Sequence, residues 1–206
     1  VTFSPHPIYD HYGERLTKQA ACAYLNLDPQ HDYALFFGLV RAYKGLDLLL
    51  DAFALVKDQL PNLHLIVAGE FYEQEQKYQE QIERLGLTDK IIIHNEFIVD
   101  EKVKYYFGAS TLITQPYRSA TQSGVTQVAF HFEKPMLVTN VGGLGEIVHD
   151  GKMGYAVDPT PAAIAEALLD YYQANRQAEF TRYLIQEKSK YSWDKLTKQF
   201  IQLKND

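Results

Sequence analysis

Two short polar segments of the chain have residue types and spacing that suit an anion. The first, SATQSG (119–124), brings hydroxyl and amide side chains and one glycine to the start of an expected helix. The second, GGLGE (142–146), follows the next expected strand and contains three glycines and a final glutamate. A polar loop that leads into a helix N-terminus presents free backbone N–H groups to an anion. Serine and threonine also occur at such places only as helix caps, so both interpretations stay open here.

Two basic residues follow the first expected strand, three positions apart. Arg41 and Lys44 stand in GLVRAYKG, which begins at Gly38. A guanidinium offers a forked pair of donors and an ammonium a point charge, so together they suit a diphosphate. The alternative is a pair of solvated cations, with Gly45 permitting the turn. The segment lacks GxGxxG, which argues against a classical dinucleotide fold, and its spacing does not match the GxxxxGK[ST] phosphate loop.

Single polar residues also stand where other strands are expected to end. Glu70 either contacts a ligand or caps the next helix, and the cap is the favoured interpretation. Glu146 either accepts hydrogen bonds from hydroxyl groups or lies in a first helical turn, where the helix dipole favours an anion. His94 and Asn95 are placed to meet a planar base, although a histidine in a strand is more often structural.

Composition and charge exclude several other classes of site. The 206 residues are 46% hydrophobic and 22% charged, as in a globular domain, and the net charge of −6 gives no footprint for nucleic acid. The seven histidines are scattered and Cys22 is alone, so neither a metal site nor an internal disulfide is expected. Ser123 and Gly124 lack the acid–base partners of a nucleophile elbow. The opening residues resemble neither a signal nor a transit peptide, and no apolar run has the length to span a bilayer, so a cytosolic fragment is expected.

The elements that must position these residues alternate between strand and helix. Strands are expected at 32–40, 63–69, 90–98, 111–114, 135–139 and within 150–158. Helices are expected at 15–25, 44–60, 71–86, 100–110, 121–133, 143–149, 159–175 and 176–205, with a break at Tyr191 and Trp193. Asp100 is expected to cap the fourth of these helices, Gly86 to stop the third, and Thr160 with Pro161 to begin the seventh. This alternation predicts a single α/β domain with a doubly wound, Rossmann-like parallel sheet, whose ligand lies at the carboxyl edge.

Taken in order, several segments resemble the C-terminal, donor-binding lobe of retaining GT-B glycosyltransferases of family 4 (glycosyl transferases group 1). HPIYDHYG resembles the interdomain linker, which gives residues 1–14 as a lead-in and 15–206 as the nucleotide-sugar-binding domain. FFGLVRAYKGLDLLLDAF resembles the element that grips the donor diphosphate, and LHLIVAGE and KIIIHNEFI resemble the next two strands. The region from FGASTLITQPYRSATQSG to VGGLGEIVHDGKMGYAV resembles the most characteristic block of the family, and YSWDKLTKQF its closing helix.

The resemblance assigns roles to the cations and exposes a departure from the family. Arg41 and Lys44 match the cations that hold the diphosphate, although Leu39 stands where many members have the arginine, so Lys44 is the safer assignment. Many members also carry two glutamates eight positions apart, one at the sugar and one at the ribose. This chain has neither, and Ala120, Thr121 and Gln122, then Gln127 and Val128, stand around those places.

The hypothesis for the site follows from those substitutions. Gln122 is expected at the sugar and Gln127 at the ribose. The backbone N–H groups of Ser123, Gly124 and Val125 are expected to receive phosphate. The other expected donor-binding residues are Gly38, Glu70, Thr121 and Glu146.

By the same resemblance, the protein transfers a sugar from a nucleotide-sugar to an acceptor hydroxyl with retention of configuration. The donor is a UDP-, GDP- or ADP-sugar, and the acceptor is a glycan, a lipid-linked sugar or a small molecule. No cofactor, metal or nucleic acid is expected. An N-terminal domain of the same protein supplies the acceptor site, so this chain alone is expected to be inactive. The resemblance implies a cytoplasmic protein, with any peripheral membrane contact made through that other domain. The alternative is a non-catalytic module that binds a nucleotide or a sugar.

Overall fold

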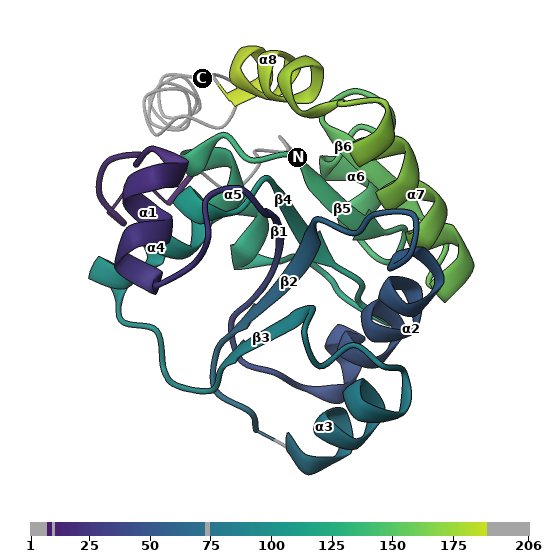
Figure 1. The fold of residues 1–206 in the computed structure, drawn as a ribbon. Coiled ribbons are helices and arrows are strands. Elements are labelled where there is room, and N and C mark those ends of the chain that lie inside the picture. Colours follow the sequence, from purple (N-terminus) through teal and green to yellow (C-terminus); the bar gives the residue numbers. More distant parts are fainter. Residues whose placement is uncertain (1–7, 10, 73–74, 189–206) are drawn as a thin grey trace, which may run out of the picture.

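The computed structural model describes residues 8–9, 11–72 and 75–188, and these form one sheet of six parallel strands (Figure 1). The strands are β1 (Asp32–Phe37), β2 (Leu63–Ala68), β3 (Ile91–His94), β4 (Leu112–Gln115), β5 (Met136–Thr139) and β6 (Gly154–Val157). Their order is β3-β2-β1-β4-β5-β6, so the chain returns past β1 between β3 and β4. This order confirms the predicted doubly wound sheet and places a switch point between β1 and β4. It is also the strand order of dinucleotide-binding folds, although the turn after β1 lacks their glycine motif.

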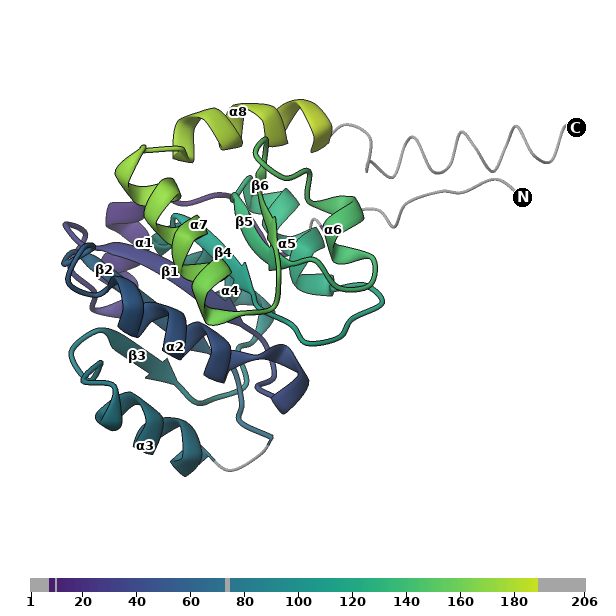
Figure 2. The ribbon, with the colours of Figure 1, turned by 90° about the vertical axis from the view of Figure 1, so that its right-hand side faces the viewer.

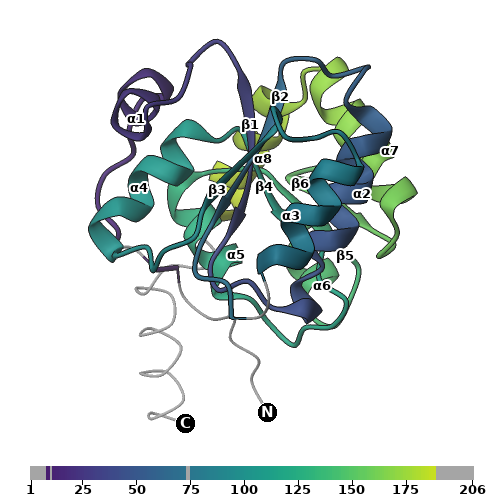
Figure 3. The ribbon, with the colours of Figure 1, turned by 60° about the horizontal axis from the view of Figure 1, so that its bottom comes forward.

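Helices cover both faces of the sheet. They are α1 (Lys18–Leu25), the 3₁₀ turn η1 (Ala42–Lys44), α2 (Leu46–Val56), α3 (Glu75–Arg84), α4 (Asp100–Ala109), α5 (Gly124–Phe132), α6 (Leu144–Ile147), α7 (Pro161–Gln173) and α8 (Gln177–Lys188). Figure 2 shows α2, α3 and α7 side by side in front of the sheet. Figure 3 shows α1 and α4 on the side of the sheet opposite to α2 and α3. The three layers therefore leave only the edges of the sheet and its two ends open.

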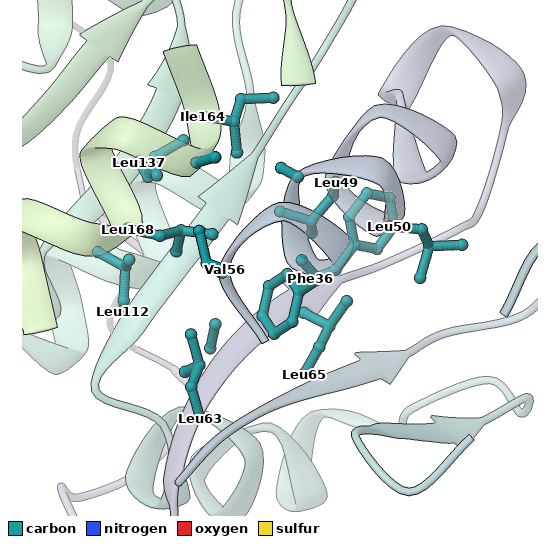
Figure 4. Packing of buried hydrophobic residues seen from close by; sticks show 14 of the residues in the cluster. Phe36, Leu49, Leu50, Val56, Leu63, Leu65, Leu112, Leu137, Ile164 and Leu168 are labelled. Atoms are coloured by element: carbon teal, nitrogen blue, oxygen red, sulfur yellow. The ribbon is translucent and has the colours of Figure 1, made fainter. Parts of the chain in front are cut away.

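Two apolar cores lie between these layers, one on each face. Along β1, Phe36 belongs to the core under α2 and α7, whereas Leu35 belongs to the core under α4 and α5. Figure 4 shows Phe36 and Leu65 of the sheet packed near Leu49 of α2 and Leu168 of α7. Because both faces are covered, the strands are apolar throughout rather than alternating. Each fully buried side chain of this size contributes about 1.5–3 kcal/mol to folding.

Several predicted boundaries differ from the structure, mostly where loops are longer than expected. α5 begins at Gly124, three residues later than predicted, because Ser123 is extended with φ −134° and ψ 125°. Residues 71 and 72 are not helical, although the third helix was predicted to begin at residue 71. The predicted Asp100 cap is wrong, because Val99 is the N-cap of α4 and Asp100 is already its first helical residue. Gly86, at φ +63°, ends the third helix, and Thr160 caps α7 through a bond from Ala163 N, both as predicted.

The two ends of the chain are described only in part. α8 confirms the first half of the predicted C-terminal helix, whereas Tyr191 and Trp193 lie outside the described residues. The division at residue 14 between a linker and a domain stays a prediction. Within that lead-in, Ile8 is buried in the core under α4 and α5.

The turn after β1 is fixed against the segment that follows β4. Gly45 links η1 to α2 at φ +68°, and a Cβ at this position would collide with the carbonyl oxygen of Pro116. Arg118 N donates to Tyr43 O over 2.7 Å, and the Arg118 guanidinium pairs with Asp47 of α2. These contacts cross the switch point between β1 and β4, and they set the position of Lys44 relative to the loop that follows.

We predict that Gly45→Ala lowers the free energy of unfolding by about 2–4 kcal/mol, because it combines a left-handed backbone with a steric clash. Gly151→Ala is the matched control, because Gly151 has the same φ of +68° but a Cβ there would have no neighbouring atom within 4 Å. The control is expected to lose only about 1 kcal/mol. Equilibrium urea denaturation measures both variants, and equal losses would show that the contact with Pro116 is unimportant.

Candidate functional site

A pocket of about 500 Å³ opens at the carboxyl edge of the sheet, beside the switch point. We call it the main pocket. Its lining includes Lys44 from η1, the loop from Ser119 to Ser123, and Gly124 and Val125 at the start of α5, with Tyr43 and Tyr117 completing the wall. Thus Lys44, Thr121, Gln122, Ser123, Gly124 and Val125 lie together, as the sequence predicted. Lys44 is the one ionised side chain in this lining, which contains no carboxylate, so the pocket favours an anion.

Lys44 is a buried cation, with only 9% of its surface exposed. Its Nζ lies 5.7 Å from the centroid of the Tyr117 ring, within the range of a cation–π contact. In the described part of the chain, no carboxylate or hydrogen-bond acceptor contacts this Nζ. Burial, helped by the nearby charge of Arg41, lowers the pKa of Lys44 to about 8. The ammonium therefore lacks the solvation that an anion in the pocket would replace.

Tyr117 forms the floor beneath this cation and stays neutral. Burial raises the pKa of Tyr117 to about 12, and its hydroxyl lies 3.4 Å from Ser123 Oγ. The buried Thr139 hydroxyl at the end of β5 donates to the carbonyl of Tyr117. The pocket wall is therefore joined both to α5 and to the sheet, and it brings no negative charge near Lys44.

The N-terminus of α5 faces the same pocket. The backbone N–H groups of Gly124 and Val125 have no hydrogen-bond acceptor among the described residues, as expected for the first turn of a helix. Ser123 is the N-cap but makes no side-chain cap bond, so its hydroxyl does not occupy these donors. These groups and Lys44 add their positive potentials at one place.

Gly38 connects the main pocket to a second pocket. A Cβ on Gly38 would lie 3.2 Å from Lys44 Nζ and 4.0 Å from Val125 Cγ2, so the two ends of the connection between β1 and α2 meet the first turn of α5 at this point. The second pocket, of about 460 Å³, lies on the other side of Gly38, and we call it the aromatic pocket. It is lined by Gly38 and Leu39 after β1, Gly69 and Glu70 after β2, and mostly apolar residues beyond them: Tyr12, Phe37, Phe97, Ile98, Asp100 and Val103.

Glu70 lines the aromatic pocket and is exposed. Residues 71 and 72 are not helical, so the favoured interpretation of Glu70 as the cap of the next helix is wrong. The carbonyl of Glu70 accepts a 2.9 Å bond from Val40 N, which joins the two loops that follow β1 and β2.

Arg41 lies at the same edge but lines neither pocket. Its Cζ lies 4.4 Å from the centroid of the Tyr72 ring, and its Nε is buried without a partner in the described structure. It is close enough to Lys44 to lower the pKa of that side chain. Of the two cations predicted for a diphosphate, Lys44 is thus the one that faces the main pocket.

The glycine loop that follows β5 packs on the loop of the main pocket. Gly143 N donates to Thr121 O over 3.2 Å, and a Cβ on Gly142 would collide with the carbonyl of Ala120. The two polar segments of the sequence therefore touch through their backbones. Glu146 lies on α6, is exposed, and lines neither pocket.

Gln127 lies behind the wall of the main pocket rather than in it. The residue is 5% exposed, and its Oε1 is buried without a partner among the described atoms. Gln115 at the end of β4 is also buried, and its Nε2 is likewise unpaired, although its Oε1 accepts a 3.2 Å bond from Thr126. Gln122, in contrast, lines the main pocket. The sugar and ribose assignments of the two glutamines stay predictions, with Gln122 in the accessible position.

His94 and Asn95, the weaker candidates, serve local structure. His94 Nδ1 lies 2.8 Å from the hydroxyl of the buried Tyr106, and burial lowers the pKa of His94. Asn95 accepts a 3.0 Å bond from Phe71 N and donates to Glu75. These bonds hold the loop after β2 against the end of β3.

Sequence reasoning missed the aromatic residues of the site. Tyr43 and Tyr117 line the main pocket and Tyr72 stacks on Arg41, yet no motif singles out any of the three. The one available signal was their position, just beyond the ends of expected strands. Within the described residues, no cluster of three metal-ligating side chains occurs, and no helix has the length and apolarity needed to cross a membrane.

The chain matches a known protein family. Residues 21–201 match the family described as glycosyl transferases group 1. The D-inositol 3-phosphate glycosyltransferase of Segniliparus rotundus is 32% identical over 144 residues, which make up 68% of this chain and 32% of that protein. The chain therefore spans about a third of the length of this curated relative.

Solved structures agree on the fold. Sucrose-phosphate synthase from Thermosynechococcus elongatus superimposes with a TM-score of 0.81 at 21% identity, over 98% of this chain and 51% of that one. The Anabaena protein Alr3699/HepE, solved in complex with UDP and glucose, gives a TM-score of 0.73 at 18% identity, over 91% of this chain and 52% of that one.

We predict that the affinity of the main pocket for inorganic pyrophosphate falls as the pH rises through 8, because Lys44 is protonated below its lowered pKa and neutral above it. Relative to the Lys44→Arg variant, the affinity should be steady below pH 8 and decrease by up to about tenfold per pH unit above it. Calorimetry at constant ionic strength measures this. Lys44→Arg is the control for the ionisation of pyrophosphate itself, because its charge does not titrate. A wild-type profile that matches this control would contradict the assignment.

Proposed function

This chain belongs to the glycosyl transferases group 1 family and has the Rossmann-like fold of one lobe of a GT-B glycosyltransferase, and from that premise we propose that it binds a nucleotide-sugar donor. One observation carries the proposal. The main pocket holds a buried, unpaired Lys44 beside the free N–H groups of α5 and contains no carboxylate. A phosphate group of the donor would satisfy both sets of donors at once.

The two pockets suit the two ends of such a donor. We place the diphosphate at Gly38, where the Lys44 ammonium and the start of α5 converge. The sugar then lies in the main pocket, among the hydroxyl and amide groups of Thr121, Gln122 and Ser123. The base lies in the aromatic pocket, whose rings offer apolar surface to a planar group. The Anabaena neighbour with UDP and glucose supports this class of ligand.

For the whole protein we propose transfer of the sugar to an acceptor hydroxyl with retention of configuration. As the bond between the sugar and the diphosphate breaks, negative charge grows on the departing phosphate oxygen. Lys44, Arg41 and the N-terminus of α5 are fixed before the reaction and stabilise that charge, which lowers the barrier. The acceptor site and its residues belong to the other domain of the protein.

The first test compares the full-length protein with the 206-residue chain against UDP, GDP and ADP and their sugars. We expect one nucleoside diphosphate to raise the melting temperature of both, since a ligand at 100 times its dissociation constant stabilises by about 2.7 kcal/mol. Only the full-length protein should transfer sugar, as followed by release of the nucleoside diphosphate. Binding without transfer by the full-length protein would favour a non-catalytic module, and binding of no nucleotide would exclude both functions.

We further predict that Gln122→Ala weakens the nucleotide-sugar about fivefold and leaves the free nucleoside diphosphate unaffected, because the lost hydrogen bond of about 1 kcal/mol goes to the sugar. Gln127→Ala is the comparison. If Gln127 contacts the ribose, this variant weakens both ligands equally, and calorimetry separates the two patterns. Unchanged binding of the nucleotide-sugar to Gln122→Ala would contradict the role of Gln122.

A further inference from the structure

The Arg41 side chain has an unusual environment for a cation at a ligand site. Within the described chain, no carboxylate pairs with it and no acceptor binds its Nε, which is buried. Its guanidinium instead lies against an aromatic ring, since Cζ is 4.4 Å from the centroid of Tyr72. The guanidinium is therefore held in place without being neutralised.

The Tyr72 ring is itself fixed by the backbone on which it stands. Tyr72 N donates to Val40 O over 3.1 Å, and Val40 N donates to Glu70 O, so the segment 70–72 is bound to the residue that precedes Arg41. On its other side, Phe71 N donates to Asn95 Oδ1, which ties the segment to the end of β3. Tyr72 as a residue is 69% exposed, so it adds little to the apolar core. Packing in the core therefore does not explain the position of the Tyr72 ring, whereas its contact with the Arg41 guanidinium does.

An aromatic face differs from a carboxylate as a support for arginine. A carboxylate would hold the guanidinium by its N–H groups and cancel its charge, whereas a ring holds it by its face. Among the described residues no acceptor or carboxylate is bound to the Arg41 N–H groups, so the ring leaves these donors free for an anion. A ring also restricts the rotamers of a side chain that otherwise loses entropy when a ligand binds.

We propose that Tyr72 is a positioning residue for Arg41, and that its ring holds the guanidinium in place to bind the donor's diphosphate. The inference rests on the proposed function and adds to it a residue outside both pockets. Arg41 lines neither pocket, and the contact with Tyr72 accounts for how it can still bind the ligand. The guanidinium would approach the diphosphate from the loop after β2, on the side opposite to α5.

The test uses the full-length protein and calorimetry with UDP, GDP and ADP. For the diphosphate that binds, Tyr72→Leu is expected to weaken affinity about two- to fivefold, the value of an exposed cation–π contact. Tyr72→Phe keeps the ring and should restore wild-type affinity. Tyr24→Leu is the matched control, because Tyr24 is also an exposed tyrosine, at 48%, but stacks on Tyr105 away from both pockets. It should bind as wild type does.

Two further measurements separate positioning from direct contact. The nucleoside without phosphates should bind Tyr72→Leu and wild type equally. In an Arg41→Gln background, Tyr72→Leu should cause no additional loss, because the ring acts through the arginine. The inference is overturned if the loss persists in that background, if the nucleoside is equally weakened, or if Tyr72→Phe fails to restore affinity.

The outcome also distinguishes this inference from the proposed function. If wild type binds a diphosphate and Tyr72→Leu binds it as tightly, only the role of Tyr72 is lost. If wild type binds none of the three diphosphates, the proposed function is wrong and the inference is lost with it.

Discussion

The contact between the turn after β1 and the segment after β4 is the constraint on which the candidate site depends. β1 and β4 are neighbours in the sheet but are separated in the sequence by β2 and β3. Gly45 lets the turn approach the carbonyl of Pro116, and Arg118 then binds both Tyr43 and Asp47. Because of this approach, Lys44 is buried against Tyr117 instead of extending into solvent. A looser turn would expose Lys44, and its affinity for an anion would then be that of a surface lysine.

The contact between these two segments also explains why the protein contains a buried ammonium group, which destabilises the fold. A buried ammonium without a partner costs folding free energy, and here that cost appears as the lowered pKa of Lys44. The surrounding layers can tolerate this cost, since large apolar cores lie on both faces of the sheet. A ligand phosphate would recover part of it. The unpaired Nε of Arg41 is a smaller instance of the same arrangement.

The fold class could be predicted from the sequence because the patterns that indicate strands and helices are local and recur along the chain. Apolar runs such as LHLIVAG and the amphipathic stretch of α2 specify strand and helix directly, and alternation of the two limits the topology to a doubly wound sheet. Boundaries were less readable where backbone conformation depended on tertiary contacts. Ser123 is extended, so α5 begins three residues late, and its first N–H groups face the pocket. The Asp100 cap failed for a similar reason, because aspartate suits a first helical turn as well as a cap.

The sequence predicted the positions of site residues only where the loop that carries the residue determines its position. That Lys44 and the segment 121–125 lie together was predictable, because both follow expected strands and parallel strands end at one edge of the sheet. The positions of Arg41, Gln127 and Glu146 were not predictable, because a side chain's direction depends on neighbours that are distant in sequence. Tyr72 is the clearest case: the contact with Arg41 joins loops after two different strands, and nothing in either loop alone indicates it. An aromatic residue that positions a cation without neutralising it does not belong to a sequence motif. Such a residue is identified from the contacts of the cation in the structure rather than from the sequence around it.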